Sequence, residues 1–181
     1  MTNTSKKILT MIIAAMLCAI GISIPMFSPF KVSMEPASFT LASHVPVMIA
    51  MFISPPVAAF VALIISFGFV SYGPVIVLRA LSHIIFASLG AYYLKKNGNT
   101  LKSLKSMIPF ALAISLIHSV AEVIVSSVYF NSDKSYVFVV LGLVGIGTVI
   151  HSLVDFSIAV LVWKPIQNVV QVPASAKVKV K

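Results

Sequence analysis

The sequence predicts an all-α integral membrane protein, a bundle of six transmembrane helices with both termini cytoplasmic. The chain has 181 residues, of which 59% are hydrophobic and only 9% are charged, and its mean hydropathy is +1.07. The apolar residues form long continuous runs, unlike the short alternating segments of a transmembrane barrel. Because a helix needs about 20 apolar residues to cross the hydrocarbon core, the chain has room for about six crossings.

Prolines and polar clusters divide the chain into the predicted helices. We expect the first helix from about Lys7 to Ile24, because Pro25 cannot continue it without losing a hydrogen bond. The uncharged stretch 36–78 is long enough for two helices, divided at Ser54 and Pro55, the first of them starting near Ala37. The last three are expected at about Val75 to Leu94, Met107 to Phe130 and Tyr136 to Trp163. Residues 1–165 thus form one membrane domain, and 166–181 a disordered cytoplasmic tail.

The lysines predict the orientation independently, because they lie in connections that did not enter the helix count. With both termini inside, the cytoplasmic segments contain Lys6, Lys7, Lys95, Lys96, Lys102, Lys105, Lys164, Lys177, Lys179 and Lys181. The outer segments contain only Lys31 and Lys134. The net charge of +9 is dispersed over linkers and tail, which favours a lipid bilayer and no nucleic acid as partner.

Ionisable side chains within the predicted helices are candidates for function, because a charged residue at a helix centre costs roughly 2.5 to 3.5 kcal/mol. They are His44, Arg79, His83, His118, Glu122, His151 and Asp155. Six of them form pairs four residues apart, and each pair shares one helix face. These faces are expected to point into the bundle.

Helix direction predicts the depth of these residues. At about 1.5 Å per residue, the outer half receives His44, Arg79, His83, His118 and Glu122, whereas His151 and Asp155 lie nearer the cytoplasm, where a structural role is favoured. The outer layer is interpreted as a substrate pocket, with Arg79 as the fixed cation for a carboxylate. The alternative is that Arg79 pairs with Glu122 and the histidines bond backbone carbonyls, so that the group only holds the bundle together.

Other patterns mostly exclude functions. The chain has no phosphate-binding loop, no HExxH helix and no catalytic triad, so no enzymatic activity and no catalytic residue are predicted. The lone Cys18 excludes a cysteine-based metal cluster, and neither a metal site nor a cofactor is predicted. Six aromatic residues near the outer face, favoured as an interfacial belt, could also cover a planar ligand: Phe27, Phe30, Phe39, Phe67, Phe69 and Tyr72. The linker Met26–Pro36 is either a lid or a passive turn.

Three segments resemble the substrate-binding S components of energy-coupling factor (ECF) vitamin transporters, in particular the niacin-specific type. They are AAMLCA at 14–19, PASFTLASHVPVMIAMFISP at 36–55 and VIVLRALSHIIFASLGAYYLKK at 75–96, and the resemblance extends to Trp163. It implies high-affinity vitamin binding in the cell membrane without transport by the chain alone. It also implies two kinds of partner, a transmembrane coupling subunit contacted through Ala15 and Ala19, and two cytoplasmic ATPase subunits.

Charge alone does not identify the ligand. Niacin offers a carboxylate for Arg79 and a ring nitrogen that accepts a hydrogen bond from a neutral histidine. Pantothenate and other small carboxylated vitamins also fit the cation. A stand-alone proton-coupled carrier and an intramembrane assembly protein remain as alternatives, although the chain shows no internal repeat of the kind found in many carriers.

Overall fold

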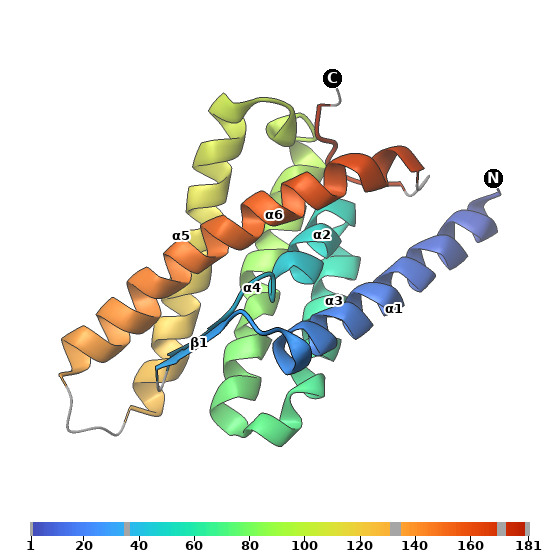
Figure 1. Cartoon of the computed structure of the whole chain (residues 1–181). Helices are drawn as coiled ribbons and strands as arrows, with labels where there is room; N and C mark the ends of the chain where they lie inside the picture. Colours follow the sequence, from blue (N-terminus) through green and yellow to red (C-terminus); the bar gives the residue numbers. More distant parts are fainter. Residues whose placement is uncertain (1, 35–36, 131–134, 170–172, 180–181) are drawn as a thin grey trace.

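A computed structural model describes residues 2–34, 37–130, 135–169 and 173–179 of the chain (Figure 1). The main helices are α1 (Asn3–Phe27), α2 (Val45–Ile53), α3 (Pro55–Gly68), α4 (Pro74–Lys96), α5 (Leu104–Val128) and α6 (Gly147–Val169). A hairpin of β1 (Lys31–Met34) and β2 (Ala37–Thr40) connects α1 to α2. Short 3₁₀ helices lie at Val70–Tyr72 and Thr100–Lys102, and a π-helix at Val137–Ile146 continues directly into α6.

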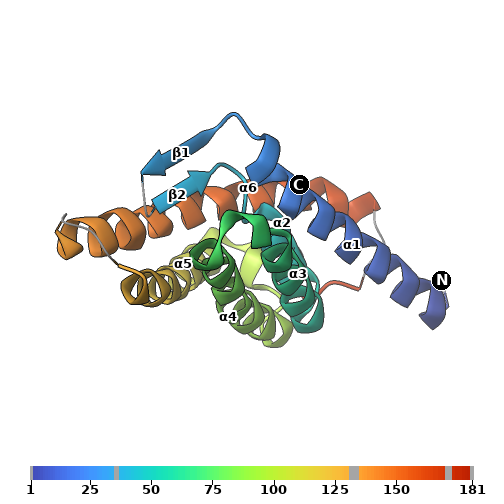
Figure 2. The ribbon, with the colours of Figure 1, turned by 90° about the horizontal axis from the view of Figure 1, so that it is seen from below.

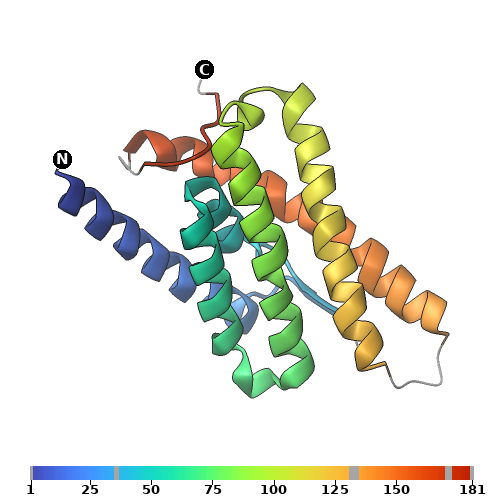
Figure 3. The same ribbon diagram turned by 180° about the vertical axis from the view of Figure 1, so that it is seen from behind.

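The basic segments gather at one end of the bundle. Figures 1 and 3 show the start of α1, the connection between α4 and α5 and the end of α6 at this end, and the connection between α3 and α4 at the opposite end. The predicted topology requires this arrangement, because these basic segments were all assigned to the cytoplasm. Which end faces the cytoplasm stays a prediction.

The lengths of the helices differ from the prediction. Among the described residues, four helices are long and apolar enough to cross a membrane: α1, α4, α5 and the continuous helix Val137–Asn168. The helices α2 and α3 have only 9 and 14 residues. The prediction that the second helix starts near Ala37 is wrong, because the strand and the turn before Val45 take up this part of the chain. The count of six crossings therefore stays a prediction.

Two helices continue past a proline that lies just beyond their predicted end. The first helix passes Pro25 and ends at Phe27, and α6 passes Pro165 and ends at Val169. In both cases the proline lies within a few residues of the helix end, where losing one hydrogen bond costs less than at the centre. Helix α6 crosses the bundle obliquely relative to α4 and α5 (Figures 1 and 3).

The shortest main helix, α2, lies at the centre of the core. The backbone groups at its two ends form hydrogen bonds with distant segments of the chain. All nine residues of α2 are buried. At its start, the backbone N–H groups of Ala42 and His44 donate to the carboxylate of Asp155 in α6, at 2.8 and 2.9 Å. At its end, the carbonyls of Ile53 and Phe52 accept hydrogen bonds from the backbone of 175–176. Buried helix ends need such partners for their free N–H and C=O groups.

The described part of the tail lies against the bundle. Trp163 donates through Nε1 to the carbonyl of Ala176 at 3.1 Å, and Gln167 exchanges two hydrogen bonds with Val178. This differs from the disordered tail predicted for 166–181. The placement follows from the need of α2 for hydrogen-bond donors at its buried end.

The hairpin covers one face of α6, as Figure 2 shows from below. Gly147 allows this close contact, because a Cβ at this position would lie only 2.7 Å from Cζ of Phe39. The Phe39 ring also lies 5.4 Å from the ring of His151. The linker Met26–Pro36 was predicted as a lid or a turn. Part of it therefore belongs to a hairpin that covers the polar centre of the bundle.

Candidate functional site

A cavity of about 110 Å³ lies between the hairpin, the start of α2 and the helices α4, α5 and α6. Its walls include all the residues predicted for the substrate pocket: His44, Arg79, His83, His118 and Glu122. All five are buried, although each carries a polar or charged group. The prediction that these five residues meet in one layer is thus confirmed, while their role in binding stays a prediction.

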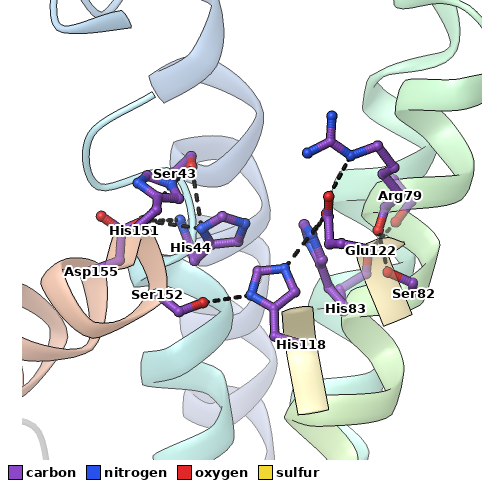
Figure 4. Close-up of polar contacts among 12 residues, drawn as sticks. Ser43, His44, Arg79, Ser82, His83, His118, Glu122, His151, Ser152 and Asp155 are labelled. Atoms are coloured by element: carbon purple, nitrogen blue, oxygen red, sulfur yellow. Dashed lines mark hydrogen bonds and ion pairs between the residues drawn. The ribbon is translucent and has the colours of Figure 1, made fainter. Parts of the chain in front are cut away.

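Glu122 connects the polar groups of α4 and α5. Nε of Arg79 donates to one carboxylate oxygen of Glu122, and Nε2 of His83 lies 3.2 Å from the other (Figure 4). Nε2 of His118 lies 3.5 Å from that second oxygen without a hydrogen bond to it. The spacing of four residues within each pair places both members on one helix face. The pair of Arg79 and Glu122 foreseen in the structural alternative therefore exists, within the cavity wall.

A second carboxylate completes the cluster. Asp155 is fully buried and accepts a hydrogen bond from Nδ1 of His44 at 3.1 Å, while Nε2 of His151 lies 3.4 Å from it. The prediction that His151 and Asp155 lie apart, nearer the cytoplasm, is wrong. It assumed a straight helix along the membrane normal, whereas the π-helix before α6 advances less per residue and α6 itself is oblique.

All four histidines of the chain meet at this point. The ring of His44 lies 4.7 Å from those of His83 and His118 and 4.8 Å from that of His151, measured between ring centroids. The rings of His83 and His118 are also 4.7 Å apart. Four imidazoles thus meet beside the buried carboxylates of Glu122 and Asp155, and the cost of burying such groups in a membrane protein indicates a function.

Neutral polar groups complete the wall, and the sequence analysis missed them. Thr148 and Ser43 line the cavity, and Oγ of Ser152 lies 2.6 Å from Nδ1 of His118. The hydroxyl of Thr148 is buried and has no hydrogen-bond partner among the described residues. A helical pattern could have identified Thr148 and Ser152, because they share a face of α6 with Asp155.

The aromatic residues separate into two groups. Phe39, Phe69 and Tyr72 line the cavity, where they can cover a planar ring. The other three are highly exposed, as expected for an interfacial belt: Phe27, Phe30 and Phe67.

The two alanines of α1 that were predicted to contact the coupling subunit lie outside the core. Ala15 and Ala19 are exposed, whereas the neighbouring Ala14, Leu17 and Cys18 are buried. The face of α1 that carries Ala15 and Ala19 is therefore available to another helix or to lipid.

The fold and the site together define a multi-pass helical membrane protein with a cavity whose wall includes buried ionisable side chains. No protein-family profile matches the chain, and no solved structure does. The chain is 42% identical over 167 residues to the niacin transporter NiaX of Lactococcus lactis subsp. cremoris strain MG1363, an alignment that covers 88% of this chain and 75% of that protein.

The chain belongs to the family of niacin-transporter S components of the ECF type. This confirms the predicted family, and a relative that is a transporter agrees with the predicted absence of enzymatic activity.

Proposed function

We propose that the chain is the high-affinity niacin-binding subunit of an ECF uptake transporter in the cell membrane. The observation that carries this proposal is the cavity that places a buried guanidinium, Arg79, beside a group of imidazoles. The relative named a niacin transporter supports it.

The carboxylate and the ring of niacin each have a counterpart in the cavity wall. A guanidinium offers five N–H donors in a planar fork and can hold two carboxylates at once, so Arg79 can bind Glu122 and the ligand together. The aromatic rings of Phe69 and Tyr72 suit the flat pyridine ring. The cavity is smaller than the roughly 300 to 1,000 Å³ typical of drug-sized ligands, which favours a ligand of one ring over the longer pantothenate.

Binding to the purified chain tests the ligand. By calorimetry in detergent, we expect niacin to bind at least 100-fold more tightly than nicotinamide or pantothenate, because only niacin has both the carboxylate and the compact ring. Equal affinity for the acid and its uncharged amide would contradict the role of Arg79 as carboxylate anchor.

Reconstitution tests the need for partners. In proteoliposomes we expect no niacin uptake by the chain alone, and ATP-dependent uptake after addition of an ECF coupling subunit and two ATPase subunits. Uptake by the chain alone, driven by a proton gradient, would instead identify a stand-alone carrier.

The exposed face of α1 is proposed as the contact with the coupling subunit. Changing Ala15 or Ala19 to Trp is expected to leave niacin binding unchanged but to reduce co-purification with the coupling subunit severalfold, because bulk prevents close approach of helices. Ile20→Trp is the matched control, since Ile20 is exposed on the same helix and already bulky. Undiminished co-purification of both alanine variants would exclude this face as the interface.

The orientation is tested by labelling single cysteines in a Cys18→Ala background. A cysteine at the exposed Asn99, in the connection between α4 and α5, is expected to react only from the cytoplasmic side. One at Ser71, between α3 and α4, is expected to react only from outside. Reversed labelling would overturn the orientation.

A further inference from the structure

We propose that His44, His83 and His118 bind one divalent transition-metal ion of the zinc class, with one coordination position open to the ring nitrogen of the ligand. That this ligand is niacin rests on the proposed function. The sequence analysis predicted no metal site, because these three histidines are far apart in the sequence and follow no metal-binding spacing.

The three histidines come from three different elements and converge. His44 immediately precedes α2, His83 lies in α4 and His118 in α5. One ring nitrogen of each lies within 4.8 Å of the others, and all three residues are buried. Nitrogen atoms around a tetrahedral zinc ion, at Zn–N distances of about 2.0 to 2.1 Å, are about 3.4 Å apart, so small side-chain rotations are enough to close the site.

Each of the three rings forms a hydrogen bond through one of its two nitrogens. Nδ1 of His44 bonds Asp155, and Nε2 of His83 bonds Glu122. Because an ionised carboxylate can only accept, these two nitrogens carry the hydrogen and the remaining nitrogen of each neutral ring keeps its lone pair. Metal-binding histidines almost always show this arrangement, in which an outer carboxylate fixes the ring and raises its basicity.

His118 completes the set. Its Nδ1 lies 2.6 Å from the hydroxyl of Ser152, and its buried Nε2 lies 3.5 Å from a carboxylate oxygen of Glu122 without a hydrogen bond to any described residue. A buried polar nitrogen without a partner is costly and calls for an explanation. With Nδ1–H donating to Ser152, Nε2 carries the lone pair that a metal ion needs.

The charges of the site favour a dication. With neutral histidines, the buried charged groups among the described residues, Arg79, Glu122 and Asp155, sum to −1, while Lys31 at the cavity wall is exposed to solvent. A monoanionic ligand alone would bring the buried charge to −2, which is expensive inside a membrane protein. A divalent cation together with the ligand carboxylate brings it to zero.

A second set of possible ligands, His44, His151 and Asp155, is less suitable. Both oxygens of Asp155 already accept hydrogen bonds from the backbone before α2, so a metal ion would have to compete with them. The three-histidine set leaves these bonds intact. It also matches catalytic zinc sites, in which three protein ligands leave a fourth position open. A pyridine nitrogen, like that of imidazole, is a suitable ligand for this position.

Metal content tests the first part of the proposal, with the full chain purified without a histidine tag. After incubation with Zn²⁺ and removal of the excess, we expect about one zinc ion per chain by elemental analysis, and at least a tenfold lower zinc affinity for His83→Gln and His118→Gln. Ser119→Ala is the matched control, because Ser119 is the buried neighbour of His118 but bonds Gly145 outside the cavity. Zinc content at background, or unchanged in both histidine variants, would overturn the proposal.

The unmodified protein tests the second part without depending on the folding of a variant. Loaded with Co²⁺, it is expected to show a visible absorption spectrum that changes on addition of nicotinate but not of benzoate, which lacks the ring nitrogen. Removing the metal with a chelator is expected to weaken niacin binding at least tenfold. Niacin affinity that is unchanged by the chelator would overturn the coordination of the ligand but leave the proposed function intact, whereas stoichiometric zinc without any niacin binding would overturn the proposed function alone.

Discussion

Changing Arg79 to Met is expected to weaken niacin binding at least 100-fold and to destabilise the protein at the same time. Hydrogen bonds to charged groups contribute roughly 1.5 to 3 kcal/mol each, so the loss of two to the ligand carboxylate exceeds the roughly 2.7 kcal/mol of a 100-fold change. Because Arg79 also pairs with Glu122, its loss leaves a buried carboxylate without its cation, which costs roughly 3 to 5 kcal/mol.

Arg79→Met combined with Glu122→Gln separates the two effects. The double variant is expected to regain most of the stability, since no unpaired charge remains, but not the affinity for niacin. Stability can be followed by the reaction of the buried thiol of Cys18 with a fluorescent probe during heating, and affinity by calorimetry. Lys96→Met is the matched control, because it removes a cation from the exposed end of the same helix. Unchanged affinity in the single variant would remove Arg79 from the binding site.

Changing Asp155 to Ala is expected to be among the most destabilising substitutions in the chain. It leaves the N–H groups of Ala42 and His44 without the acceptor that they share. Leaving a buried donor unsatisfied costs about 1 to 3 kcal/mol, so the two together predict a loss of roughly 2 to 6 kcal/mol. Niacin binding should fall as well, because Asp155 also orients the ring of His44.

The reaction of Cys18 during heating measures this loss, with Ser157→Ala as control. Ser157 lies two residues further along α6, is exposed and bonds only the carbonyl one turn before it, so its change is expected to matter little. Equal behaviour of the two variants would show that Asp155 does not stabilise the start of α2.

The sequence predicted the polar centre well where it rested on helix periodicity. The spacing of four residues placed Arg79 with His83 and His118 with Glu122 on single faces, and the alternating direction of the helices brought both pairs to one depth. This reasoning needs only the geometry of a regular helix. It succeeded because α4 and α5 are regular throughout and long enough to cross a membrane.

The prediction failed where the backbone departs from a regular helix. The short hairpin before α2 has no alternating run long enough to indicate strands, and it shortens the second helix. The π-helix before α6 changes both the depth and the direction of His151 and Asp155. Neutral residues such as Thr148 have no charge of their own to mark them, and only the face of α6 that they share with Asp155 could have identified them.

The long-range hydrogen bonds at both ends of α2 have a consequence for the order of folding. Its start depends on Asp155, more than 100 positions further along the chain, and its end on residues 175–176. During translation, α2 therefore leaves the ribosome long before any of these partners exists. The cavity, which lies at the start of α2, is accordingly expected to be the last part of the protein to form, after α6 has entered the membrane and folded back over the helices made before it.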